Sequence, residues 1–235
     1  MIKQKPKIPS CNECVSDMSS LFRHLTNEQL ETLNYDKSCQ FYHRGDYVFH
    51  EGNRATGCYC IYSGVVKLYK TGIEGKKQII ILAKKGDIIG YRSVIAAEPF
   101  CTTAQVHEDA SLCFIPSDVI HKLIQQNHAF SLAMLKLVCK ELGEANNIIT
   151  DIAQKTVKER LAEALLVLQS SFGNDTDGFL RITLTREELS NIVGTATESV
   201  IRQLSDFKSD RLIELCGRKI KLLNIKQLER YANMP

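Results

Sequence analysis

A run of apolar residues spaced alternately three and four apart is the feature that most constrains the fold of this chain. This spacing is the a/d repeat of a coiled coil, and it predicts a helix of about 25 residues with a narrow apolar stripe. Such a helix typically pairs with a copy of itself, whereas a helix that packs onto its own domain carries a wider stripe. We therefore expect a symmetric dimer, with a long core helix as the alternative. The interface positions are Leu135, Val138, Leu142, Ala145, Ile149 and Ile152.

The segment that precedes this helix, residues 40–116, has the pattern of short β-strands. Eight of the 13 glycines of the chain lie between Gly45 and Gly90, and β-branched and aromatic runs separate them. Short runs of this kind between glycine turns are typical of a small antiparallel barrel or sandwich. We expect the segment to be all-β, with strands over 47–49, 59–62, 65–69 and 78–82.

The segment that follows the heptad repeat mixes helices with short strands. Helical periodicity continues over 157–168 and ends at 173–178, a stretch rich in glycine and aspartate. A strand is expected over 179–184. Further on, a basic turn separates two short apolar runs, which predicts a hairpin with strands over 212–215 and 220–223.

Two short helices are expected between that strand and the hairpin. Thr185 with Glu188, and then Thr195 with Glu198, each match the Ser/Thr-x-x-Glu capping box that begins a helix. Gly194 ends the first helix, and the second is expected to continue through residue 207. Two short helices joined by a tight glycine turn are typical of a helix-turn-helix. With the hairpin, the last third of the chain is expected to be a winged helix-turn-helix.

The second helix of this pair is the candidate DNA-reading element, because a recognition helix places its first turns in the major groove. Glu198 and Arg202 are four residues apart and share one face of the helix. Arginine suits guanine and glutamate accepts from cytosine, so this pair suits neighbouring G·C base pairs. The alternatives are that Glu198 only caps the helix, or that the two side chains only pair with each other. Phosphate contacts are expected from Thr185, Arg186, Ser199, Arg218 and Lys219.

Composition narrows the function classes only modestly. The net charge of +3 favours no class of partner, and the longest apolar runs have five residues, far short of the ~20 that span a membrane. The first ten residues lack a secretory signal, so we expect a cytoplasmic protein without membrane contact, whose nine cysteines are reduced. No catalytic triad, His-rich metal motif or phosphate loop is present, so we expect no enzyme. A thiol-redox enzyme that uses Cys11 and Cys14 is the alternative.

The order of glycine-rich barrel, heptad helix and winged helix-turn-helix resembles the CRP/FNR family of bacterial transcription regulators. The resemblance covers residues 21 to 223, and its most specific stretches are 45–52 (GDYVFHEG), 59–64 (YCIYSG), 85–90 (KGDIIG), 159–165 (ERLAEAL), 184–189 (LTREEL), 193–194 (VG) and 198–202 (ESVIR). It implies an α+β fold with an N-terminal arm, a β-roll sensor domain of the cyclic-nucleotide-binding type, a dimerisation helix and a winged helix-turn-helix DNA-binding domain. The implied boundaries are 1–20, 21–126, 127–155 and 156–235.

The resemblance also implies partners and a DNA sequence. In relatives with a Glu-x-x-x-Arg pair, the two side chains read a TGA core in each half-site of a palindrome. This role is implied for Glu198 and Arg202, and contact with the adjacent base is implied for Thr197. Double-stranded DNA and a second copy of the chain are the expected partners, with RNA polymerase as a further candidate.

The ligand implied for the β-roll is not a cyclic nucleotide. Members that bind one hold its phosphate with a short helix, a glutamate just after a glycine, and an Arg-Ser-Ala run. Here Tyr91 follows Gly90, the later run begins Thr102-Thr103, and Arg92 stands outside the pattern. Because both the glutamate and the arginine are missing, we expect no cyclic AMP and a regulator that responds to another signal. A cyclic-nucleotide regulatory subunit is a further alternative, which shares the barrel but would not need the winged helix. These five residues remain the candidate ligand pocket.

Cysteines give the second set of sensor candidates. Oxygen-sensing relatives bind a [4Fe–4S] cluster through three N-terminal cysteines and one in the barrel. Cys11, Cys14 and Cys113 match three of these, but Ser20 stands where the remaining cysteine is expected, and such a cluster normally has four ligands. Cys39 is a substitute only if the chain folds back. An iron–sulfur cluster, another metal, a thiol switch and no sensory role therefore remain open, and the leading interpretation includes no cofactor.

Overall fold

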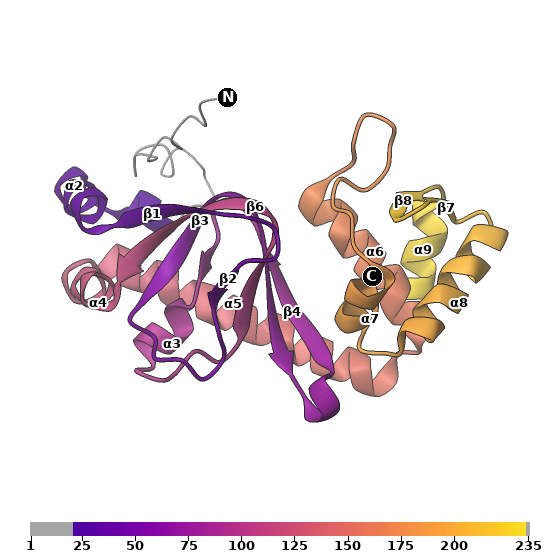
Figure 1. Cartoon of the computed structure of the whole chain (residues 1–235), viewed down its shortest axis with the longest axis horizontal. Coiled ribbons are helices and arrows are strands. Elements are labelled where there is room, and N and C mark those ends of the chain that lie inside the picture. The colour runs from indigo at the N-terminus through magenta and orange to yellow at the C-terminus, as the bar shows by residue number, and fades with distance from the viewer. Residues whose placement is uncertain (1–20, 234–235) are drawn as a thin grey trace. The chain divides into compact units, whose positions relative to one another are not determined.

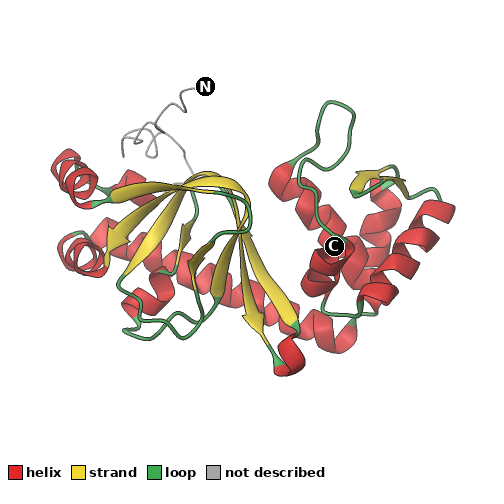
Figure 2. Cartoon of the chain, viewed as in Figure 1, coloured by secondary structure: helices red, strands yellow, loops and turns green. Residues whose placement is uncertain are grey.

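The computed structural model describes residues 21–233, which form two compact units. The first holds the described residues up to Thr71 together with Ile79–Leu142, and the second holds Gly72–Gln78 and the described residues from Gly143 onward. Figure 2 shows that the first unit contains the large sheet and that the second is mostly helical. Most of the elements are labelled in Figure 1. In chain order they are η1 (Leu21–His24), α2 (Asn27–Asp36), β1 (Ser38–Tyr42), β2 (Tyr47–Phe49), β3 (Gly57–Thr71), η2 (Ile73–Gly75), β4 (Lys77–Ala83), β5 (Ile88–Ile89), α3 (Tyr91–Ile95), β6 (Thr103–Pro116), α4 (Ser117–Gln126), α5 (His128–Gln154), α6 (Val157–Phe172), α7 (Arg186–Val193), α8 (Thr197–Ser209), β7 (Ile213–Cys216), β8 (Lys219–Leu222) and α9 (Ile225–Ala232).

The sheet of the first unit has the strand order β1-β6-β3-β4, with β2 also paired to β6 and β5 to β3. This confirms the strand-rich segment, but two details of the sequence prediction are wrong. Gly64 does not separate two strands: it is a bulge within β3, where its φ is +87° and a Cβ would lie 2.3 Å from the carbonyl oxygen of Asp109. The segment is also not all-β, because the short helix α3 interrupts it.

The core of the first unit consists of two clusters. One is formed mainly by side chains of strands β2 to β6 and contains Phe49 and Phe100, whose rings stack with centroids 3.9 Å apart. The other joins the sheet to η1, α2, α4 and the start of α5, and Phe130 and Met134 are the buried residues that α5 contributes to it. The first half of α5 is therefore held on its own domain.

The second unit is organised around α6, which packs against α7, α8 and α9. The wing strands β7 and β8 form the expected antiparallel pair. Compared with the predicted ranges, β7 is shifted one residue toward the C-terminus and β8 one residue toward the N-terminus. The strand expected over 179–184 does not form: Leu180 makes only an isolated bridge with Asn174, and its amide donates to Ile220 instead. The α+β class, with a sheet domain, a long helix and a winged helix-turn-helix, is confirmed.

Candidate nucleic-acid interface

The helix α7 begins with the predicted capping box. The Thr185 hydroxyl accepts from the amide of Glu188 at 3.0 Å, and the Glu188 carboxylate accepts from the amide of Thr185 at 2.9 Å. These bonds satisfy two of the amides that a helix start leaves unpaired. Thr185, expected to contact phosphate, therefore also fixes the start of α7.

The turn between α7 and α8 depends on Gly194, which has φ +71° and ψ +51° as the C-terminal cap of α7. This left-handed conformation favours glycine. The second capping box is wrong: Ala196 occupies the N-cap of α8 and makes no side-chain cap bond. Thr197 instead pairs its hydroxyl with that of the buried Ser190, at 3.0 Å, and so joins α7 to α8 across the turn.

The outer face of α8 carries the predicted base-reading pair. Glu198 and Arg202 are both exposed, and neither side chain has a hydrogen bond or ion pair with another residue of the described part of the chain. Because the N-cap is Ala196, Glu198 does not cap the helix, and it is not paired with Arg202. The opposite face of α8 is anchored in the core by Val200, Leu204 and Phe207. Ser199, the expected phosphate contact on this helix, is half-buried.

Two basic side chains, one on α7 and one on the wing, connect the wing to the rest of the second unit. Arg186 Nη2 donates to the carbonyl oxygen of Gly217 at 2.9 Å, and Lys219 Nζ lies 3.0 Å from the Asp175 carboxylate. The bond from Lys219 lowers the pKa of Asp175, and the same carboxylate raises the pKa of Lys219. Lys219 thus has a negative partner in the protein, whereas Arg218 at the wing turn is exposed and has none among residues 21–233.

The predicted dimer seam is exposed along most of α5. Leu135 is 59% exposed, Leu142 61% and Ile149 66%, which are high values for large apolar side chains. Ile152 and Ala145 are exposed as well, and only Val138 is partly covered, by the core of the first unit. Every residue over 142–150 is exposed, so this stretch of helix has no covered face within one chain.

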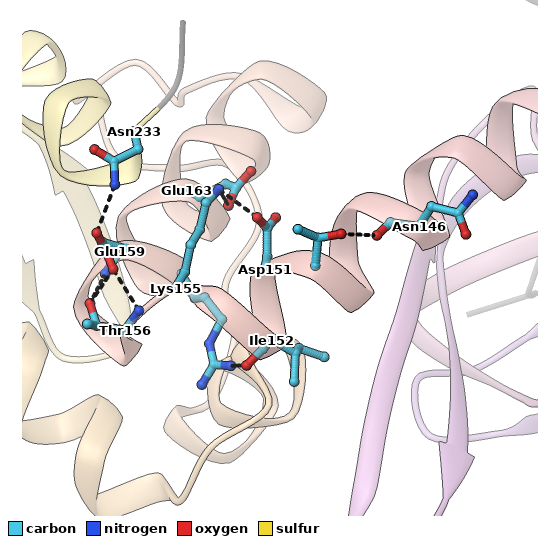
Figure 3. Close-up of polar contacts among 10 residues, drawn as sticks. Asn146, Asp151, Ile152, Lys155, Thr156, Glu159, Glu163 and Asn233 are labelled. Atoms are coloured by element: carbon cyan, nitrogen blue, oxygen red, sulfur yellow. Dashed lines mark hydrogen bonds and ion pairs between the residues drawn. The ribbon is translucent and has the colours of Figure 1, made fainter.

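The junction between α5 and α6 is a polar cluster that sequence reasoning missed (Figure 3). Lys155 Nζ lies 2.9 Å from Asp151 and 2.7 Å from Glu163, and all three side chains are largely buried. Burial lowers the pKa of Lys155, but the two carboxylates outweigh it and raise the pKa overall. Arg160 Nη1 donates to the carbonyl oxygen of Ile152, which caps the end of α5. The cluster fixes the direction in which α6 leaves α5.

The next helix start belongs to the same cluster. Thr156 and Glu159 form a capping box at the start of α6, and Asn233 donates to the Glu159 carboxylate at 2.8 Å. Hydrogen bonds from Thr156 lower the pKa of Glu159. The Thr-x-x-Glu spacing here is the signal by which sequence reasoning could have found this junction.

Two of the five residues of the candidate ligand pocket, Tyr91 and Thr103, are buried. Tyr91 is 3% exposed and part of the core, and burial raises the pKa of its hydroxyl. A Cβ at Gly90 would lie 2.8 Å from the Phe100 ring, and the buried Thr103 hydroxyl accepts from the amide of Glu51. Of the five predicted residues, Arg92 is exposed and Thr102 is half-buried.

The cysteines differ from the prediction that all are reduced. Cys39 and Cys113 face each other on β1 and β6 with Cα atoms 4.0 Å apart, and they form a disulfide. The expectation missed it because 74 residues separate the two in sequence. A disulfide sulfur is not a thiolate, so Cys113 is not available as a metal ligand in this state. Cys11 and Cys14 lie outside the described residues, and a metal site with Cys113 stays a prediction that requires the disulfide to be reduced.

Within residues 21–233, no three His, Cys, Asp or Glu side chains are arranged to hold a metal ion. None of the helices described here is both long enough and apolar enough to cross a membrane.

Comparison with known proteins matches both units. Residues 39–127 match the cyclic nucleotide-binding domain family, and residues 159–231 match the Crp-like helix-turn-helix domain family. The chain is 29% identical to the CRP-like cAMP-activated global transcriptional regulator of Mycobacterium tuberculosis over 80% of its length and 85% of that protein's. It is 27% identical to the fumarate and nitrate reduction regulatory protein of Vibrio cholerae, over 100% of this chain and 98% of that protein. FixK2 from Bradyrhizobium japonicum has the same fold, with a TM-score of 0.74 at 22% identity over 83% of this chain and 96% of that one.

Proposed function

The chain belongs to the CRP/FNR family of transcription regulators, and on this basis we propose that it acts as a homodimer that reads palindromic DNA with a TGA core in each half-site. The family consists of DNA-binding regulators and not of enzymes. In the proposed complex α8 of each protomer enters the major groove, and the paired α5 helices hold the two α8 helices one helical turn of DNA apart. RNA polymerase is the proposed partner of the bound dimer.

The observation that carries this proposal is the state of Glu198 and Arg202. Both are exposed on one face of a helix that is anchored on its other face, and neither has a partner within the described residues. No protein contact therefore has to break before the guanidinium reaches a guanine or the carboxylate reaches a cytosine amine. A bidentate contact of this kind contributes roughly 1–3 kcal/mol of discrimination against the wrong base.

The neighbouring side chains support contacts with the DNA backbone. Arg218 extends from the wing turn without a partner among the described residues, so it is the proposed main phosphate contact of the wing. Lys219 is proposed to contribute less, because Asp175 already neutralises part of its charge. Arg186 positions the wing through Gly217 and is proposed to act on DNA mainly in that way.

The exposed seam of α5 supports the homodimer. Leu135, Leu142 and Ile149 recur every seven residues, and a second copy of the helix would bury each of them against its own equivalent. Apolar burial contributes about 25 cal/mol per Å², which makes the exposed stripe costly in an isolated chain. The core-helix alternative from the sequence accounts only for the first turns of α5, which Phe130 and Met134 hold on the sheet domain.

The signal is proposed to be something other than a cyclic nucleotide. A phosphate at the usual place would need a cation, but the buried Tyr91 follows Gly90 where the nucleotide-binding members have a glutamate, and Thr102 begins the later run where they have an arginine. The M. tuberculosis relative is described as cAMP-activated, so the relatives themselves leave cyclic AMP as a candidate to be tested.

A fluorescence-anisotropy titration tests the proposed function. The full chain is titrated against a labelled duplex that contains TGA half-sites as an inverted repeat and against a duplex with both half-sites scrambled. We expect tighter binding to the palindrome by at least 10³-fold, as for sequence-specific DNA-binding proteins. Arg230→Ala, on α9 outside the helix-turn-helix and the wing, is the control and should bind like the wild type. Equal affinity for both duplexes would contradict the proposal.

A further inference from the structure

Three cysteines lie side by side across three neighbouring strands of the first unit. Cys39 of β1 is the register partner of Cys113 of β6, and Cys113 is also the register partner of Cys60 of β3. Register partners point to the same face of a sheet, so these side chains form one row, which we call the cysteine row. Within it, Cys39 and Cys113 form a disulfide, and Cys60 is buried and not disulfide-bonded.

Of the three side chains in the cysteine row, only Cys39 is accessible to solvent to an appreciable extent. Cys39 is half-buried on β1, the end strand in the order β1-β6-β3-β4. Cys113 is 3% exposed and Cys60 is 4% exposed. A small oxidant or a dithiol in solution therefore meets Cys39 first, and Cys113 lies directly behind it at a Cα separation of 4.0 Å. A reactive thiol next to a resolving thiol is the arrangement of reversible redox sites.

We propose that Cys39 and Cys113 are a reversible redox site for hydroperoxides, with Cys39 as the reacting sulfur and Cys113 as the resolving sulfur. In the reduced protein the Cys39 thiolate attacks the outer peroxide oxygen, and with one proton it forms a sulfenic acid and releases an alcohol, or water from hydrogen peroxide. The Cys113 thiol then forms the S–S bond and releases one water molecule. A dithiol returns both sulfurs to thiols and itself becomes a disulfide.

The cysteine row shares a buried cluster with the helix that carries the dimer seam. Cys60 and Cys113 belong to the same buried cluster as Phe130 and Met134 of α5, and the seam residue Val138 packs against that cluster. Formation of the Cys39–Cys113 bond ties β1 to β6 within this cluster. Because packed cores transmit small displacements, the bond biases how the start of α5 sits on the sheet. This regulatory part rests on the proposed function, whereas the redox chemistry does not.

Thiol mapping tests the redox chemistry on the full chain without DNA. The protein is reduced with dithiothreitol, exposed to hydrogen peroxide, alkylated, digested and analysed by mass spectrometry. We expect a Cys39–Cys113 linked peptide that forms with peroxide and disappears with dithiothreitol, and a melting temperature about 5–10 °C lower after reduction because a long loop is opened. Cys39→Ser and Cys39→Ala should both leave Cys113 alkylatable.

A matched variant and a DNA titration complete the test. Cys101 is half-buried like Cys39 but is a free cysteine, so Cys101→Ala should form the link as the wild type does. Peroxide-treated wild type in which Cys39 and Cys113 stay alkylatable, or a link from either to Cys11 or Cys14, would overturn the redox site. The oxidised and reduced wild types should differ at least fivefold in Kd for the palindrome. Equal, specific binding in both states would overturn the regulatory part alone, and no specific binding in either state would instead contradict the proposed function.

Discussion

Arg186 Nη2 donates to the carbonyl oxygen of Gly217 across 2.9 Å, and this bond joins the first turn of α7 to the turn of the wing. The residues are separated by 31 positions, and Gly217 has φ +58°, a backbone conformation that favours glycine. The other terminal nitrogen of Arg186 is buried without a partner among the described residues, and burial lowers the pKa of the guanidinium. The wing and the helix-turn-helix are thus held together by a side chain expected from sequence to touch only phosphate.

Replacing Arg186 by Ala should loosen the wing. We expect a loss of about 1–2 kcal/mol in the free energy of unfolding, because a charge-assisted hydrogen bond is removed, and weaker binding to all DNA sequences. Urea unfolding and anisotropy titrations measure the two effects. Arg218→Ala is the matched control: it should weaken DNA binding and its salt dependence but change stability by less than about 0.5 kcal/mol. If Arg186→Ala is as stable as the wild type, the anchoring role is wrong.

Replacing Arg202 by Ala should change which sequences are bound. The loss of a bidentate guanine contact should cost roughly 1–3 kcal/mol at the palindrome and relax preference at one base pair of each half-site, while nonspecific binding stays nearly unchanged. Titrations against duplexes that carry each base at that position measure the effect. A variant that still discriminates as the wild type does would show that Arg202 does not read bases.

Replacing Leu142 by Glu should separate the dimer. Two such carboxylates would face each other across the two-fold axis, and burial of unpaired charge is costly. We expect monomers at micromolar concentration in sedimentation velocity, with a parallel loss of affinity for the palindrome. Asn147→Glu, exposed on the same helix but opposite the seam, should remain dimeric. An unchanged dimer mass for Leu142→Glu would instead favour the core-helix alternative.

Replacing Lys155 by Met should weaken the junction of α5 and α6 in a pH-dependent way. The two carboxylates raise the pKa of Lys155 in the folded state, so its stabilisation is complete below the unfolded lysine pKa of about 10.4 and is lost as pH rises through the folded value. At pH 7 we expect a loss of about 1 kcal/mol. Thermal melts should show this gap narrowing as pH rises above about 10.4, with Lys226→Met, at an exposed lysine, unaffected. A gap that is constant up to pH 11 would contradict the ion-pair explanation.

Millimolar cyclic AMP should leave the melting temperature and the DNA affinity of the protein unchanged. A ligand that binds the folded state at 100 times its Kd stabilises it by about 2.7 kcal/mol, which would raise the melting temperature by several degrees. Differential scanning fluorimetry measures this directly, with cyclic GMP as the companion ligand. A clear rise with cyclic AMP would show that a nucleotide is held without the usual glutamate and arginine.

Local patterns with one dominant cause could be predicted from the sequence. Thr185 is the N-cap of α7 and forms the expected capping box, and the heptad positions from Leu135 onward lie on one helix. Both features depend on residues close in sequence and need no distant partner. The same box at Thr195 did not form: Ala196 is the N-cap, α8 starts one residue later than expected, and the hydroxyl of its first residue, Thr197, pairs with Ser190 of α7.

Features that depend on distant pairs were out of reach. The Cys39–Cys113 disulfide, the bond from Arg186 to Gly217 and the Lys219–Asp175 pair join residues 74, 31 and 44 positions apart. Local periodicity carries no information on such pairs, because their contact follows from strand register and helix packing.

Selection from a random DNA library is the most direct test of the central claim that a dimer of this chain reads inverted half-sites through α8. We predict enrichment of TGA and its inverted complement with half-site centres one helical turn apart, bound by two protomers per duplex. The same selection with Arg202→Ala should lose the preference at one position of each half-site. Enrichment of no motif, or of an unrelated motif that Arg202→Ala leaves intact, would contradict the account.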